Sequence, residues 1–351
     1  FDYFSLGGQS ISSNSNLLIY GVDTVSRREY TLYVKDIVND KLLSDKIDNT
    51  TGSGVWANDN KTVFYTKKDP NTLRSYRVFK HTLGTDVSDD VMVFEESDET
   101  YFVGVGKSKS QKYIMISSNS TLSTETRYID ADLPDSEWTI VLPREADHEY
   151  GVSHYGDHFY IHTNKDAKNF KLVKTPVENT EIENWTDVIP HREDVLLEGT
   201  DFFSSHLVLS ERKEGLTEIR IKSWDDTEDY YLEFNDPAYM AFTGSNPDYD
   251  SQVLRFGYTS MTTPYTTYEH AFSDKSRVQL KQQKVLGGKF DSANYSSERI
   301  MVEARDGVKV PVSIVYRKGV KLDGKNPLLL YAYGSYGSSM DPGFSSTRLS
   351  L

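Results

Sequence analysis

The stretch "ANDNKTVFYT" (residues 57–66) joins a polar turn to a short apolar and aromatic run, and this combination recurs along most of the chain. Asn, Asp and Ser favour such turns because their side chains bond the nearby backbone and tolerate left-handed conformations. The runs follow one another at intervals of 45 to 50 residues, and they begin at Leu18, Val63, Tyr113, Phe159, Leu207 and Val253. This even period indicates a repeat architecture.

A second strand-like run begins 10 to 13 residues after each first run, and the second runs are Tyr30–Val34, Tyr76–Lys80, Thr126–Ile129, Phe170–Val173, Thr217–Ile221 and Thr266–Tyr268. Alternating apolar and polar residues in these runs are typical of half-buried strands. Three or four antiparallel strands per unit predict a mainly β protein with a seven-bladed-type β-propeller, of which about six blades are visible. A β-sandwich would not repeat so evenly. Equivalent strands of successive blades should hold Ile19, Phe64, Ile114, Tyr160, Val208 and Leu254.

The composition changes near Gly287 and Gly288, which divides the chain into residues 1–288 and residues 289–351. Residues 296–319 predict two strands around a turn, because Asp306-Gly307 supplies the positive φ angles that a tight hairpin needs. Residues 328–333 (LLLYAY) are a nearly continuous apolar run, typical of a strand buried on both faces of an α/β sheet. We expect the first region to be the propeller and the second to be the start of another, incomplete domain.

The composition also argues against several classes of partner. A formal net charge of -14 leaves no basic stripe for a nucleic acid and favours cationic ligands. No window of 18 consecutive apolar residues predicts a transmembrane helix. The absence of cysteine excludes disulfides and thiolate zinc sites. No metal site is expected, because the histidines that recur every four residues, His154, His158 and His162, are interpreted as blade-surface residues.

Three stretches resemble a known family: "GVWANDNKTVFYTKKDP" (residues 54–70), "ERIMVEARDGVKVPVSIVYRKG" (298–319) and "LLLYAYGSYGSSMDPGF" (328–344). Together with the propeller they look like the prolyl oligopeptidase family of serine peptidases. The resemblance is closest to its oligopeptidase B branch, whose members cleave short peptides after Arg or Lys. In this family a propeller caps an α/β-hydrolase domain that is assembled from an N-terminal segment and from everything after the propeller. The resemblance therefore implies a fragment: a propeller (1–288) and the first strands of an α/β-hydrolase peptidase domain (289–351).

The Ser-His-Asp triad of such a peptidase is not found in this sequence. An α/β-hydrolase carries its serine in a G-x-S-x-G turn between a strand and a helix. The nearest match, residues 337–341, has Asp at the last position, and Pro342 and Gly343 oppose the helix that should follow. In the family all three triad residues come later in the chain, so we expect this chain to be inactive alone. Acyl transfer through a triad needs no cofactor.

The resemblance implies roles for three residues. In the family's Y-x-Y-G-x-[YF]-G turn the second tyrosine donates its hydroxyl to the scissile carbonyl oxygen, and Tyr333 holds this position. Tyr336 matches a position that lines the substrate pocket. Asp341 matches the first of two acidic residues that bind a basic substrate side chain, whereas Gly343 replaces the second. Without the family, Tyr333 would be interpreted as a packing residue and Asp341 as part of an Asp-Pro-Gly turn.

The expected function is that of a cytoplasmic serine oligopeptidase that hydrolyses short cationic peptides after Arg or Lys. The propeller would gate access to an internal active site, and the remainder of the peptidase domain would be its structural partner. Two alternatives stay open. A post-proline oligopeptidase of the same family would require an apolar pocket instead of an acidic one. A non-catalytic β-propeller binding module would end near Gly288.

Overall fold

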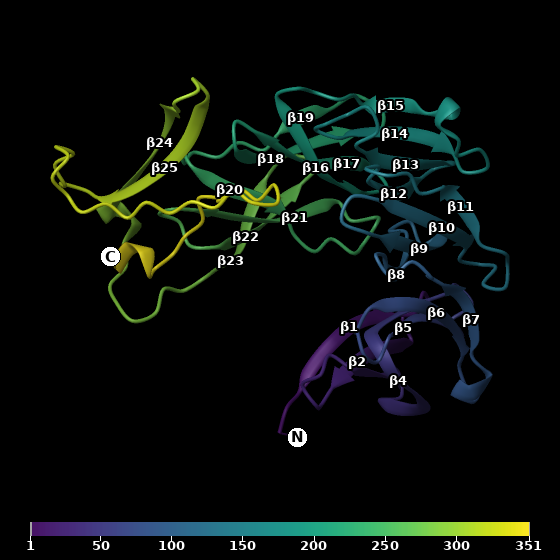
Figure 1. The fold of residues 1–351 in the computed structure, drawn as a ribbon. Coiled ribbons are helices and arrows are strands. Elements are labelled where there is room, and N and C mark those ends of the chain that lie inside the picture. The colour runs from purple at the N-terminus through teal and green to yellow at the C-terminus, as the bar shows by residue number, and fades with distance from the viewer. Residues whose placement is uncertain (1, 351) are drawn as a thin grey trace. The chain divides into compact units, whose positions relative to one another are not determined.

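The computed structural model describes residues 2–350, and strands account for most of their regular structure. Strands that are consecutive in sequence pair as antiparallel neighbours, so every sheet is a meander (Figure 1). The described residues contain no α-helix. Their helical turns are four short 3-10 segments: η1 (Val87–Asp89), η2 (Ile182–Asn184), η3 (Ser292–Asn294) and η4 (Arg348–Ser350).

The first sheet has seven strands and combines two of the expected repeats. Its strands are β1 (Ser5–Ile11), β2 (Leu17–Asp23), β3 (Tyr30–Asp36), β4 (Lys41–Trp56), β5 (Thr62–Lys68), β6 (Ser75–Thr82) and β7 (Val91–Glu95). The long strand β4 joins the repeats, because its first part pairs with β3 as far as Thr50 and its last part pairs with β5.

Four four-stranded sheets follow, each of them one repeat. The first two are formed by β8 (Phe102–Lys107), β9 (Tyr113–Asn119), β10 (Thr124–Asp130) and β11 (Thr139–Leu142), and by β12 (Tyr150–Tyr155), β13 (His158–Thr163), β14 (Lys171–Pro176) and β15 (Thr186–Ile189). The last two are formed by β16 (Val195–Phe202), β17 (His206–Lys213), β18 (Leu216–Ser223) and β19 (Asp229–Tyr231), and by β20 (Tyr239–Thr243), β21 (Val253–Ser260), β22 (Thr266–Ala271) and β23 (Arg277–Gln282).

The repeat predicted from the sequence is confirmed at the level of strands. The six marker positions all lie on the second strand of their repeat, namely on β2, β5, β9, β13, β17 and β21. All six side chains are buried: Ile19, Phe64, Ile114, Tyr160, Val208 and Leu254. The first strand of each sheet, such as β8 with its two glycines, gave no clear signal in the sequence.

The second strands are buried because both of their faces are covered. Side chains alternate between the two faces of a strand. On β5, Val63 and Tyr65 enter one hydrophobic cluster with β2 and β3, whereas Phe64 enters another cluster with β9 and β10. On β9, Ile114 and Ile116 share the cluster of Phe64. The core of this part of the chain thus consists of layers between the faces of successive sheets.

Glycines allow β4 to cross the first two strands. A Cβ atom on Gly21 of β2 would lie 2.3 Å from the carbonyl oxygen of Gly52, and Gly52 itself has a φ of +94°. The crossing is fastened by Trp56, whose indole N–H donates to the Ser10 carbonyl at 3.0 Å. The close backbone contact leaves no room for a side chain at Gly21.

The described chain divides into two compact units: residues up to 167 together with 171–190, and residues 168–170 together with 191 onward. The second unit contains the predicted hairpin, formed by β24 (Tyr295–Glu303) and β25 (Lys309–Arg317). Its turn has the predicted Gly at a φ of +83°, and Val308 accepts a bond from the Ala304 N–H at 2.8 Å. The domain boundary expected at residue 288 stays a prediction.

The strand expected at residues 328–333 is wrong for this structure. The segment is irregular, and its side chains are exposed, for example Leu328 at 82% and Leu330 at 76%. A strand is stable only when neighbouring strands satisfy its backbone N–H and C=O groups. Among the described residues no strand pairs with this segment, so the apolar run alone does not form a sheet.

The three histidines do not converge. His154 of β12 pairs across from Phe159, whereas His158 and His162 lie on the alternate positions of β13 and so on the other face. His154 is buried rather than on the surface, where its Nδ1 bonds the Ser110 hydroxyl at 2.8 Å. Burial lowers the pKa of His154 to about 4.

Within residues 2–350, no helix has the length and apolar character required to cross a membrane.

Replacing Gly21 by Ala should destabilise the protein by about 1–3 kcal/mol, because the new methyl group would overlap the backbone of Gly52. Gly104→Ala on β8 is the matched control, since nothing lies within 4 Å of the added Cβ. Urea denaturation of the two variants and the parent should separate them. Equal midpoints for Gly21→Ala and the parent would show that β4 does not pass as closely as described.

Candidate functional site

The tyrosine-rich turn is the first part of the candidate site. Tyr336 and Gly337 have φ angles of +56° and +70°, and the Ser338 N–H closes the turn on the Ser335 carbonyl at 3.1 Å. The side chain of Tyr333 is half exposed, and Tyr336 is 98% exposed. Both phenols therefore face outward from the described residues. Their proposed contacts with a substrate stay predictions.

Asp341, three residues beyond this turn, is held by an arginine. Arg212 donates from Nη1 to Oδ1 at 2.6 Å and from Nη2 to Oδ2 at 3.2 Å. Two parallel N–H···O bonds to one carboxylate are the geometry in which a guanidinium binds most specifically. Asp341 thus binds a guanidinium group of the chain itself, and its expected contact with a basic substrate side chain stays a prediction.

Two further acceptors hold Arg212 on strand β17. Its Nε donates to Glu198 of β16 at 2.5 Å, and its Nη1 also donates to the carbonyl of Gly215 at 3.2 Å. Burial opposes the charge of Arg212, but the hydrogen bonds to Asp341 and Glu198 outweigh it and raise the pKa of the guanidinium. The arginine is therefore a permanent cation that two carboxylates share.

The residues after Asp341 pack against the last four-stranded sheet. Pro342 is buried, and the Phe344 N–H donates to the hydroxyl of Thr259, at the end of β21, at 3.1 Å. The ring of Phe344 meets the edge of Phe290 with centroids 5.0 Å apart. These contacts fix residues 341–344, whereas the tyrosine-rich turn before them is exposed.

The hairpin β24–β25 contacts the same region from another direction. Arg299 donates to the carbonyl of Glu214 and, at 3.2 Å, to the hydroxyl of Ser313. Glu214 and Gly215 form the tight turn between β17 and β18, with φ angles of +48° and +76°. A side chain at Gly215 would meet Arg299 and Pro311, so this turn is shaped to receive the hairpin.

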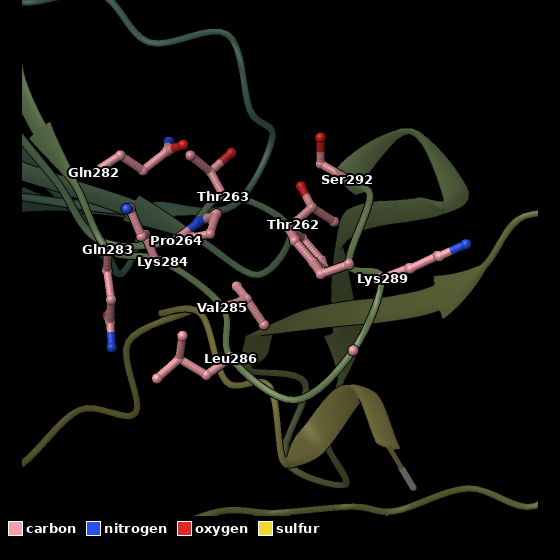
Figure 2. Close-up of a pocket in the computed structure, with 12 residues that line it drawn as sticks. Thr262, Thr263, Pro264, Gln282, Gln283, Lys284, Val285, Leu286, Lys289 and Ser292 are labelled. Atoms are coloured by element: carbon pink, nitrogen blue, oxygen red, sulfur yellow. The ribbon is translucent and has the colours of Figure 1, made fainter.

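A pocket of about 460 Å³ lies between two connections of the last four-stranded sheet (Figure 2). One wall is the loop after β21, with Thr262, Thr263 and Pro264, and the other is the connection from β23 to η3, with Val285 and Phe290. The ring of Phe290 also contacts the ring of Phe344, so the pocket wall packs against the anchored segment. The pocket is lined by Lys284 and Lys289 as well, which makes it a poor site for a cationic side chain.

The sequence predicted Asp341 but missed its partners. Arg212 and Asp341 are 129 residues apart, and Glu198 lies on β16, whereas Arg212 lies on β17 and Asp341 in an irregular segment. No local motif marks Arg212, because its role depends on the pairing of β16 with β17 and on the path of the C-terminal segment. Within the described residues, no group of His, Cys, Asp or Glu side chains is arranged to hold a metal ion.

The comparisons with known proteins agree on one family. Residues 2–283 match the family model described as "Prolyl oligopeptidase, N-terminal beta-propeller domain". The chain is 44% identical over its whole length to a dipeptidyl aminopeptidase BI of Pseudoxanthomonas mexicana and 33% identical to protease 2 of Moraxella lacunata. It covers 48% and 50% of these relatives, so it spans about half the length of the curated proteins it matches.

Solved structures show the same likeness. Oligopeptidase B from Leishmania major superposes with a TM-score of 0.87 at 31% identity, over 98% of this chain and 49% of that one. Oligopeptidase B from Trypanosoma brucei, with covalently bound antipain, gives a TM-score of 0.87 at 32% identity, over 99% and 50%. The β-propeller predicted from the repeat is thus confirmed.

Thr259→Val should loosen the anchored segment, because it removes the acceptor of the Phe344 N–H while keeping the side chain's shape. A net hydrogen-bond contribution of about 1 kcal/mol corresponds to an increase of about fivefold in amide exchange at Phe344. Thr267→Val on β22 is the control, since its hydroxyl is not the acceptor of that amide. Unchanged exchange at Phe344 in the Thr259 variant would mean that packing alone holds the segment.

Proposed function

This chain belongs to the prolyl oligopeptidase family of serine peptidases. We propose that it is part of an oligopeptidase that cleaves short peptides after Arg or Lys. The observation that carries this proposal is Asp341, which follows the tyrosine-rich turn and binds a guanidinium through both of its oxygens. A carboxylate that holds arginine in this geometry is suited to a basic substrate side chain. The net charge of -14 would also attract cationic peptides.

Tyr333 is proposed as the donor to the oxyanion. A phenol is neutral at pH 7 and donates a strong hydrogen bond, so it can stabilise the negative charge that develops on the scissile carbonyl oxygen. The half-exposed side chain of Tyr333 is free to face a substrate. Tyr336 would line the pocket nearby. The nucleophile and its base would come from residues outside this sequence.

Two other specificities compete with this proposal. The relative at 44% identity is named a dipeptidyl aminopeptidase, which favours removal of dipeptides from a free N-terminus. A dipeptidyl aminopeptidase needs a free amino group at the N-terminus of its substrate, whereas the proposed oligopeptidase accepts a substrate whose N-terminus is blocked. A post-proline peptidase would act on Gly-Pro substrates and would have no use for a carboxylate at Asp341.

We expect a full-length protein that carries this chain to hydrolyse an N-blocked Arg-Arg aminomethylcoumarin and to lose this activity with a serine-directed inhibitor. The chain of residues 1–351 alone should be inactive, since it contains no G-x-S-x-G turn. The proposal fails if the enzyme cleaves Arg-Arg aminomethylcoumarin only when its N-terminal amine is free, because this requirement would indicate a dipeptidyl aminopeptidase. Cleavage of Gly-Pro substrates alone would indicate the post-proline enzyme, and no cleavage at all would indicate a binding module.

In that full-length enzyme, Tyr333→Phe should lower kcat by about 100-fold or more and leave KM nearly unchanged. The oxyanion exists only in the transition state, so the lost donor should not weaken ground-state binding. Tyr331→Phe is the control, because it removes a hydroxyl from a similarly exposed ring two residues earlier. Steady-state kinetics decide the question, and a parental kcat in Tyr333→Phe would make Tyr333 a packing residue.

A further inference from the structure

Arg212 occupies Asp341 in the way a substrate arginine would. Its guanidinium donates one hydrogen bond to each carboxylate oxygen, at 2.6 and 3.2 Å. The pair is only partly buried, with 15% of the Arg212 side chain and 22% of the Asp341 side chain exposed. An arriving cation can therefore reach the carboxylate without unfolding the sheet.

Arg212 would not be left unpaired after giving up Asp341. Its Nε keeps Glu198 at 2.5 Å, and its Nη1 keeps the carbonyl of Gly215 at 3.2 Å. Breaking a buried ion pair is costly mainly when one charge remains without a partner. Here the guanidinium retains a carboxylate and a backbone oxygen, so its release from Asp341 is inexpensive.

Asp341 belongs to a network of carboxylates and guanidinium groups. Arg212 lies between two carboxylates, Glu198 and Asp341. Arg299 adds a second positive charge that interacts with Asp341, and Glu214 adds a third carboxylate beside it. Arg348 adds a third guanidinium, because it donates to the Gly343 carbonyl at 3.1 Å. The three carboxylates are thus matched by three guanidinium groups, and an arriving basic side chain has to compete with Arg212 for Asp341.

We propose that Arg212 is a specificity-determining residue: it occupies Asp341 in the substrate-free protein and yields it to the basic side chain of an arriving peptide. This inference rests on the function proposed above. Exchange of one guanidinium for another conserves both hydrogen bonds to Asp341. A lysine ammonium is a point charge and cannot reproduce the paired bonds. A substrate arginine therefore displaces Arg212 from Asp341 more readily than a substrate lysine does. We expect this difference at the second basic position of a doubly basic peptide.

The test uses the full-length enzyme and three blocked dipeptide substrates, Arg-Arg, Lys-Arg and Ala-Arg aminomethylcoumarin. Arg212→Gln should lower KM for Arg-Arg by about tenfold, narrow the preference for Arg-Arg over Lys-Arg, and leave kcat and the Ala-Arg kinetics unchanged. Arg212→Lys should give an intermediate KM, because it keeps the charge and loses the paired bonds.

Arg220→Gln is the matched control. Arg220 on the neighbouring strand β18 binds Asp229 through two bonds of 2.7 and 2.6 Å, with 20% of its side chain exposed, and the substrate comparison should not change in this variant. If Arg212→Gln does not fold, Glu198→Gln replaces it. Removing the alternative partner of Arg212 should bind it more firmly to Asp341 and raise KM for Arg-Arg.

An equal loss of kcat on all three substrates in Arg212→Gln would overturn the inference, because Arg212 would then be an anchor for the turn. An unchanged KM for Arg-Arg would overturn it as well. If the parent enzyme cleaves none of the substrates, the proposed function fails but Arg212 is still tested. Calorimetry with Arg-Arg amide should then give tighter binding to Arg212→Gln than to the parent, and equal binding would refute the role of Arg212.

Discussion

Packing of the second strand of a repeat between two layers of side chains is the constraint on which the structure depends. On β5 the neighbours Val63 and Phe64 enter different hydrophobic clusters, one with β2 and β3 and the other with β9 and β10. A sheet of this kind is not stable alone, because removing either neighbour exposes one complete face of its central strand. The candidate site depends on the same order of strands, since Arg212 and Thr259 lie on β17 and β21, the second strands of the last two four-stranded sheets.

Much of this fold could be predicted because its signals are local. A polar turn, a buried run and an alternating run recur at one period, and each of them is visible within ten residues. The crossing of β4 could not be predicted, since it depends on the contact of Gly21 with Gly52, which only the folded backbone brings together. The strand predicted at residues 328–333 does not form, although its signal is local. Its apolar character is local, but a strand also needs partners for its backbone, and the described residues supply none.

In the candidate site, too, some residues could be predicted from the sequence and others could not. Tyr333, Tyr336 and Asp341 stand in one short motif, so a resemblance was sufficient to select them. The cation that neutralises Asp341 comes from a strand 129 residues earlier, and its second partner, Glu198, comes from a third segment. Arginine is common on exposed strand faces, and the sequence around Arg212 does not distinguish it from Arg220. Only the path of residues 341–344 across the sheet decides which of the two meets Asp341.

The two arginine pairs of this unit differ in what their opening would change. Arg220 and Asp229 lie nine residues apart on paired strands, so their bonds strengthen a connection that the backbone already makes. Arg212 joins a strand to an irregular segment, where Asp341 stands between the exposed tyrosine-rich turn and the anchored Phe344. When a side chain changes partners on a rigid strand, little else moves. When Asp341 changes partners, its backbone stays in place, because Pro342 is buried and the Phe344 N–H remains bonded to the Thr259 hydroxyl. An exchange of guanidinium groups at Asp341 therefore changes which side chain the carboxylate binds without moving the tyrosine-rich turn.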